Sequence, residues 1–205
     1  MAKAKKSKRK SAARRPNRGS RSTPKDAIAL LTADHREAEE LFEQFQKSGS
    51  DSRKQELARK VCRALKVHAQ IEEEIFYPSF LQATEEADIH HEAEVEHKGA
   101  KRLIADIEAS GPDDEYFDAK VKVLSEMIKH HVNEEEKRGG MFSKARQSGM
   151  NLKELGEELG VRKAELMGED DAPHKARGAR RGSRKSVDPE DGSMLRSLLH
   201  RSGQV

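Results

Sequence analysis

The apolar residues of this chain recur three and four positions apart in four consecutive segments, and this spacing limits the possible folds more than any other feature. It gathers apolar side chains on one face of an α-helix, whereas a half-buried strand would alternate. Short polar turns, such as Ser48-Gly49 and Gly111-Pro112, separate the segments. Helices joined by short turns pack as antiparallel neighbours. The sequence therefore predicts an all-α protein built on an up-down-up-down four-helix bundle.

Each predicted helix carries a histidine in phase with its apolar face, and two of these histidines are followed one turn later by a glutamate. On a helix, residues four apart lie one above the other on the same face. A buried carboxylate is costly unless it is paired or bound to a metal. We therefore predict a metal site inside the bundle, with the ligands His35, His68, Glu72, His97, His131 and Glu135.

The fourth helix offers two possible pairs. Its apolar stripe reaches Ile128, and the same register continues to His131 and Glu135, whereas His130 and Glu134 are rotated by about 100°. Aligning the glutamate triplets of the second and fourth helices favours His130 and Glu134 instead. We choose His131 and Glu135 and keep the other pair as the alternative.

The second helix contains the segment that follows Glu72. Residues 75–77, Ile-Phe-Tyr, are expected to form an apolar wall beside the metal site. Pro78 has no amide proton, and its ring collides with the preceding turn, so a kink or an end of the helix is expected there.

Four imidazoles and two carboxylates without a thiolate suit iron, manganese or zinc better than calcium or magnesium. Because glutamates can bridge two ions, a dinuclear centre fits this set. One alternative is a metal-free helical interaction bundle, which requires the four in-phase histidines to be coincidental. Another is a ferritin-like carboxylate site, because Glu94 and His97 form a Glu-x-x-His element, but that architecture needs two such elements and the chain shows one.

The charges divide the chain into parts. Residues 1–25 hold 11 Lys and Arg and no Asp or Glu, which predicts a disordered basic arm. Residues 26–147 hold the bundle, 148–168 form a short helix that packs across its end, and 169–205 form a mostly disordered tail. A basic arm attracts phosphate backbones. A nucleic-acid-associated protein, binding without sequence preference through residues 1–25, is therefore the alternative function.

The remaining patterns concern location and activity. The sequence contains no run of about 18 apolar residues and no charged-then-apolar secretory signal, so we expect no transmembrane segment. The single cysteine, Cys62, excludes an intramolecular disulfide and favours a cytoplasmic protein. No separate nucleophile or phosphate-binding loop is visible. We therefore favour a metal- or oxygen-binding or sensing protein over a dedicated enzyme.

Together these motifs resemble the hemerythrin HHE cation-binding family. The resemblance rests on Asp34-His35, His68–Pro78, Val95–Lys98 and His130–Glu136, and it covers roughly residues 26–147. It implies that the six predicted ligands hold a non-haem centre of two irons per chain. It also implies that the centre binds or senses oxygen, nitric oxide, peroxide or iron. Oxygen-carrying members have a second histidine where this chain has Lys101, and this departure favours redox, peroxide or sensing chemistry over simple oxygen carriage.

Overall fold

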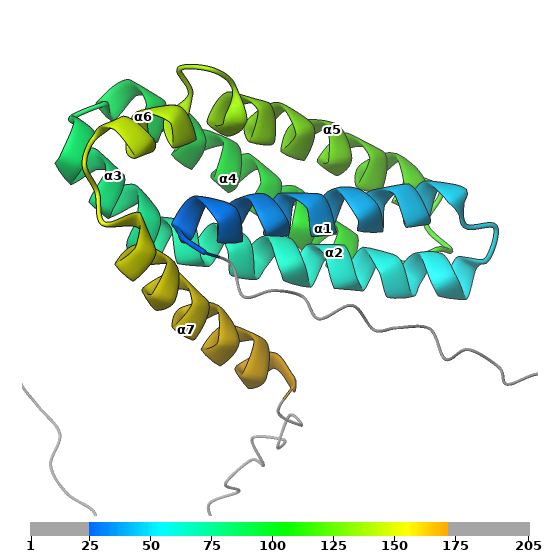
Figure 1. Ribbon diagram of the computed structural model, residues 1–205. Helices are drawn as coiled ribbons and strands as arrows, with labels where there is room; N and C mark the ends of the chain where they lie inside the picture. Colours follow the sequence, from blue (N-terminus) through cyan, green and yellow to red (C-terminus); the bar gives the residue numbers. More distant parts are fainter. Residues whose placement is uncertain (1–24, 172–205) are drawn as a thin grey trace, which may run out of the picture. The chain divides into compact units, whose positions relative to one another are not determined.

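The structure is a computed structural model that describes residues 25–171. Almost all of the predicted basic arm and most of the predicted tail therefore lie outside the described residues. Between residues 25 and 171 the regular elements are helices alone (Figure 1). They are α1 (Ala27–Lys47), α2 (Asp51–Ile71), the π-helical segment η1 (Glu72–Phe76), α3 (Tyr77–Thr84), α4 (Ala87–Ala109), α5 (Phe117–Glu136), α6 (Met141–Gln147) and α7 (Leu152–Asp171).

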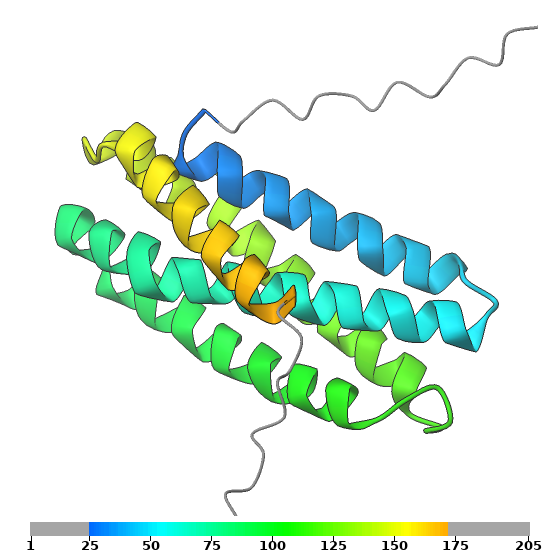
Figure 2. The same ribbon diagram turned by 90° about the horizontal axis from the view of Figure 1, so that it is seen from below.

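Four long helical segments form an antiparallel bundle, which confirms the predicted fold (Figures 1 and 2). They are α1, the continuous run of α2, η1 and α3, then α4 and α5. Helices α1 and α2 begin where a side chain satisfies a free amide group. The Asp26 carboxylate accepts a hydrogen bond from the Ala29 amide at 2.8 Å, and Ser50 caps α2 in the same way.

The bundle has two apolar clusters, and on α1 and α4 the predicted histidine lies between them along the helix. On α1, Leu31 belongs to the first cluster and Ala38 to the second, with His35 between them. On α4, Ala93 and Ala100 flank the histidine in the same way. The four histidines therefore form a polar layer that apolar side chains cover on both sides.

The second long helix does not end at Pro78. It widens into five residues of π-helix, in which the Tyr77 amide donates to the Glu72 carbonyl, and then continues as α3. The proline lies in the first turn of α3, where its missing amide proton costs least. The π-helical turn is thus the local response to the proline, and such turns are frequent at functional sites.

The extra C-terminal helix, α7, packs against α1, α2 and η1 (Figure 2). It crosses the outer faces of α1 and α2, rather than lying only across the bundle end as expected. Leu155 and Leu159 are buried in the first apolar cluster. At Gly156 an added Cβ would lie 2.6 Å from the Ala27 backbone nitrogen, so the glycine allows the two backbones to approach closely. No helix in the described part of the chain is both long enough and apolar enough to cross a membrane.

Candidate metal centre

The side chains of all six predicted ligands meet in the polar layer. Each is at most 6% exposed. Their donor atoms form two groups in which all atoms lie within 4.8 Å of one another. One group contains His35, His68, Glu72 and Glu135, and the other contains Glu72, His97 and His131. All four long segments of the bundle thus contribute to one compact set of nitrogen and oxygen donors.

The two glutamates lie between two pairs of histidines, which are His35 with His68 and His97 with His131. Glu72 Oε2 is 3.2 Å from His68 Nε2 and 3.4 Å from His97 Nε2. On the other side, Glu135 Oε2 is 3.4 Å from His35 Nε2, and its Oε1 is 3.7 Å from His131 Nε2. Each carboxylate therefore faces one imidazole of each pair, which is the arrangement that a carboxylate bridging two cations requires.

The alternative pair on α5 lies outside this set. The His130 side chain is 62% exposed, and its Nε2 contacts Glu96. Glu134 pairs with Lys137 near the end of the helix. The structure therefore turns His131 and Glu135 inward and the alternative pair away.

Each of the four inward histidines directs Nε2 to the centre and Nδ1 to a carboxylate outside it. A carboxylate accepts hydrogen bonds, so Nδ1 of His35, His97 and His131 carries a proton, and a neutral imidazole then offers its Nε2 lone pair inward. The contact of His68 is the longest of the four: it is an ion pair with Asp34, and Nδ1 of His68 is buried without a hydrogen bond. The Nδ1–oxygen distances are 2.7 Å for His35–Glu136, 3.5 Å for His68–Asp34, 3.0 Å for His97–Glu73 and 2.8 Å for His131–Glu96.

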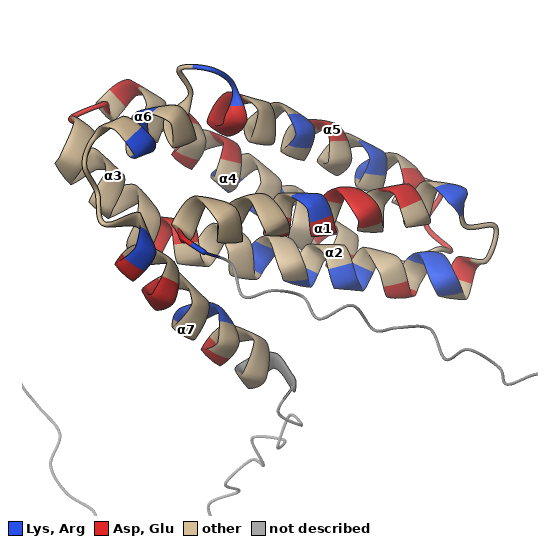
Figure 3. Ribbon diagram, viewed as in Figure 1, with Lys and Arg blue, Asp and Glu red and all other residues tan. Residues whose placement is uncertain are grey.

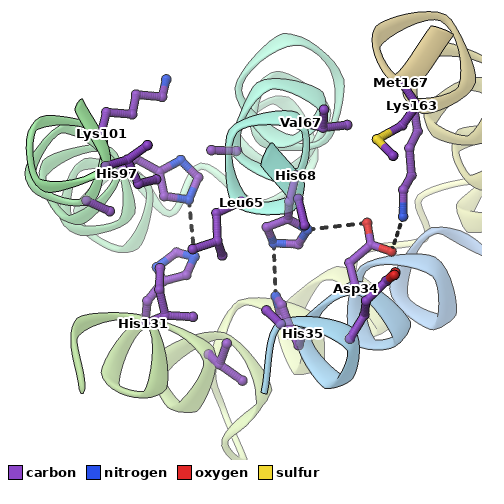
Figure 4. A pocket seen from close by; sticks show the side chains of 18 residues that line it. Asp34, His35, Leu65, Val67, His68, His97, Lys101, His131, Lys163 and Met167 are labelled. Carbon is purple, nitrogen blue, oxygen red and sulfur yellow. Dashed lines mark hydrogen bonds and ion pairs between the residues drawn. The ribbon is translucent and has the colours of Figure 1, made fainter. Parts of the chain in front are cut away.

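This arrangement leaves nitrogen lone pairs facing each other. His35 Nε2 lies 3.1 Å from His68 Nε2, and His97 Nε2 lies 3.2 Å from His131 Nε2 (Figure 4). When both Nδ1 atoms carry protons, either an added proton or a shared metal cation between the two Nε2 atoms relieves the repulsion within each pair. Glu72 Oε1 and Glu135 Oε2 are also buried without a hydrogen-bond donor. These donors fit iron, manganese or zinc.

The electrostatics of the centre also favour positive charge. Burial opposes protonation of His68, but the charge of Glu72 and the contact with Asp34 outweigh it and raise the pKa to about 10. For His97, burial is likewise outweighed, here by hydrogen bonds to Glu72 and Glu73, which raise the pKa to about 9. The same histidines hold the pKa of Glu72 well below its usual range despite its burial. The site thus stabilises cations.

Tyr77 is a residue of the centre that the sequence analysis assigned to an apolar wall. Its hydroxyl donates to Glu135 Oε1 at 3.1 Å and lies 3.2 Å from His97 Nε2 and 3.4 Å from Glu72 Oε2. Burial, followed by the charges of Glu135 and Glu72, raises its pKa well above the usual value. In a π-helical turn, residues five apart lie one above the other. Tyr77 lies five residues after Glu72, so the π-helical turn brings both onto one face. Pro78, next to Tyr77, was the sequence signal that could have indicated such a turn.

Lys101 does not point toward the six donors. Its ammonium contacts both carboxylate oxygens of Glu73, at 2.7 and 2.6 Å. The hydrogen bond from His97, and then Lys101, lower the pKa of Glu73 to about 2. Lys101 therefore acts on the centre through the carboxylate that holds His97.

A largely apolar cavity of about 60 Å³ adjoins the four imidazoles (Figure 4). Its volume exceeds the space that one water molecule needs. Side chains of α7 also line the cavity, through Lys163 and Met167. The apolar part of its wall includes Ala38, Leu65, Ala100, Ile104, Ile128 and Val132.

Part of the chain is similar to known proteins. Residues 26–139 match the family model described as the hemerythrin HHE cation binding domain. A DNA nickase of Nostoc sp. (strain PCC 7120 / SAG 25.82 / UTEX 2576) is 31% identical over 107 residues, which are 52% of this chain and 30% of that protein. The chain thus matches less than a third of the length of this curated relative.

A solved structure is similar in fold. It is the crystal structure of a hemerythrin HHE cation binding domain-containing protein from Mycobacterium kansasii. The TM-score is 0.60 at 19% sequence identity, over 70% of this chain and 88% of that chain.

Proposed function

This chain belongs to the hemerythrin HHE cation-binding family, and on that premise we propose that its bundle holds a non-haem di-iron centre which binds or senses a small ligand. The proposed ligands are His35, His68, Glu72, His97, His131 and Glu135. Manganese and zinc are the other metals that this donor set accepts. We further propose a cytoplasmic location, in keeping with the single, buried cysteine Cys62.

The observation that carries the proposal is the position of the two glutamates between two pairs of imidazole nitrogens. One ion would be held by His35 and His68, and the other by His97 and His131. Glu72 and Glu135 would supply an oxygen to each and offset their charge. Four protein donors per ion would leave positions open for a small ligand, since iron commonly accepts six.

The surroundings favour oxygen, nitric oxide or peroxide as that ligand. Iron, when bound, supplies the redox or Lewis-acid chemistry. The apolar wall of the cavity admits a small uncharged molecule and limits the water around it. The raised pKa of Tyr77 keeps its hydroxyl protonated, so it remains a hydrogen-bond donor. This chain has Lys101, which is held by Glu73, at the position where oxygen-carrying members have a further histidine. The missing imidazole favours redox or sensing chemistry over simple oxygen carriage.

A second candidate function is nucleic-acid binding through the basic arm. The similarity to a DNA nickase favours it, although the match covers under a third of that protein. The described helices intersperse acidic and basic residues (Figure 3), whereas residues 1–25 carry bases without acids. We therefore expect DNA binding that weakens steeply with salt and is lost when residues 1–25 are deleted. Binding that survives the deletion would contradict this candidate.

Metal analysis of the full chain tests the first proposal. We expect about two irons per chain after anaerobic loading with ferrous iron, and a spectrum that changes on exposure to air. His68→Ala should lower the iron content sharply, while His91→Ala, at an exposed position on α4, should leave it unchanged. A well-folded chain that takes up no metal would overturn the proposal and support the metal-free interaction bundle.

A further inference from the structure

Each carboxylate that holds a histidine Nδ1 also contacts a basic side chain. Glu73 contacts Lys101, and Glu96 contacts the exposed His130. The four histidines thus share one pattern. A carboxylate contacts Nδ1 of the imidazole, and a basic side chain contacts that carboxylate. The two remaining sets are His35–Glu136–Arg36 and His68–Asp34–Lys163.

The set that ends in Lys163 differs from the others in its origin. Arg36, Lys101 and His130 lie on the bundle helices α1, α4 and α5, whereas Lys163 lies on α7. This helix follows residues 26–139, the part of the chain that matches the family model. The Lys163 ammonium is 2.5 Å from Asp34 Oδ1, while Asp34 Oδ2 faces His68 Nδ1 (Figure 4). An element outside the matched domain therefore reaches the side chain that supports a predicted ligand.

Packing holds Lys163 in this position. Leu159 is fully buried one turn before it, and Leu166 is buried one turn after it. Asp34 is only 11% exposed, so its charge interacts with Lys163 with little screening by solvent. Arg162, the neighbour of Lys163, pairs instead with Glu74. The two adjacent bases of α7 are themselves about equally exposed, but Glu74 is 41% exposed and only the ion pair of Lys163 faces the metal centre.

We propose that α7 tunes the metal centre through Lys163, which fixes Asp34 and thereby sets how strongly His68 donates electrons to the ion it holds. This inference rests on the proposed function. A carboxylate that faces Nδ1 of an imidazole ligand raises the basicity of that ligand, and Asp34 Oδ2 lies 3.5 Å from His68 Nδ1. The ammonium of Lys163 draws charge from that carboxylate and weakens the effect. Lys163 is therefore a positioning residue, and it acts on the half of the centre that contains His35 and His68.

The proposal predicts shifts of opposite sign. Without the ammonium, the negative charge of Asp34 acts more strongly on His68 Nδ1 and makes His68 a stronger donor, so the oxidised metal is favoured and the reduction potential falls. With Asn at position 34 the acceptor is neutral, and the reduction potential rises. Hydrogen bonding around the ligands is an established means by which proteins set such potentials.

The experiment uses the full chain loaded with iron. Spectroelectrochemistry should give a lower reduction potential for Lys163→Met, a value near wild type for Lys163→Arg, and a higher one for Asp34→Asn. Lys163→Met should shift the potential less in the Asp34→Asn variant than in the wild-type chain, because Lys163 acts through Asp34. Arg162→Met is the matched control and should leave the potential unchanged.

Two further measurements separate the possible failures. Thermal unfolding and iron content show whether each variant is folded and loaded. In the metal-free chain, the ring nitrogen NMR shifts of His68 should change in Lys163→Met and not in Arg162→Met. Equal potentials in wild type and Lys163→Met, at equal iron content, would overturn the inference and leave the proposed function intact. A wild-type chain without iron would overturn the proposed function, and the inference with it.

Discussion

Tyr77 shows how one residue joins the two halves of the centre. Its hydroxyl contacts Glu72, His97 and Glu135, which come from three different elements. The ring itself packs in the first apolar cluster, so only its polar end faces the donors. The side chain thus serves both the apolar core and the polar layer.

Replacing Tyr77 with Phe removes this hydroxyl and keeps the ring. Because Glu135 then loses its hydrogen-bond donor in a buried position, we expect the free energy of unfolding of the metal-free chain to fall by about 1–3 kcal/mol. Denaturant unfolding measures this change. Tyr116→Phe is the control, since Tyr116 is exposed. A stability unchanged by Tyr77→Phe would mean that the hydroxyl contributes nothing to the fold.

The raised pKa values of His68 and His97 predict a pH dependence for the metal-free chain. Their folded values of about 10 and about 9 lie above the ordinary histidine value of 6.5. A raised pKa contributes stability that is fully present below pH 6.5 and is lost as pH rises through the folded values. We therefore expect the free energy of unfolding to decline between about pH 6.5 and pH 10.

Denaturant titrations with a chelator present, across that range, measure the decline. His68→Gln should make it shallower because one of the two raised groups is gone. Iron should oppose the decline, since it replaces the protons at Nε2. Stability of the metal-free chain that rises over this range would contradict the prediction.

At the scale of elements, the π-helical segment η1 and helix α7 complete the centre. The π turn brings Tyr77 onto the face of Glu72, and α7 brings Lys163 to Asp34. Both depend on local geometry that departs from a simple bundle. The position of α7 relies on its close approach to α1 at Gly156.

Two glycines of α7 provide a matched test of that approach. Alanine is the better helix former by about 1 kcal/mol at either position. At Gly156 the added methyl group would meet the Ala27 backbone, and overpacking costs about 1–3 kcal/mol. At Gly168 no atom lies within 4 Å of the added group. We expect Gly156→Ala to lower the denaturant midpoint and Gly168→Ala to leave it equal or higher; similar effects at both sites would argue against tight packing of α7.

At the scale of the described molecule, the polar layer divides the core into two apolar clusters. Buried carboxylates and facing imidazole nitrogens in the middle of a core oppose folding unless a cation compensates them. The proposed metal would therefore link all four bundle segments at the point where apolar packing is interrupted.

Chelation of the metal should consequently destabilise the whole bundle. A ligand that binds only the folded state adds about 4 kcal/mol when its free concentration is a thousand times its dissociation constant. We expect a large fall in the thermal midpoint on removal of iron, with the helical circular dichroism retained at low temperature. An identical midpoint with and without iron would show that binding does not stabilise the bundle.

Much of the fold and of the candidate site follows from local periodicity. The predicted bundle is confirmed, and the six predicted ligand positions converge in the structure, although their binding of metal stays a prediction. The sequence did not reveal Tyr77 as a residue of the centre, because an α-helical register places it away from Glu72. The π turn changes that register. The choice of His131 and Glu135 over His130 and Glu134 rested on the same periodicity.

The sequence by itself determined which residues form helices and which face of each helix is buried, because both depend on spacings of a few residues. Only the tertiary structure decided which side chains support those ligands. Asp34 and Lys163 stand 129 positions apart, and no local pattern relates them. Their meeting depends on the rotation and offset of packed helices, which are settled by the close fit of many side chains together.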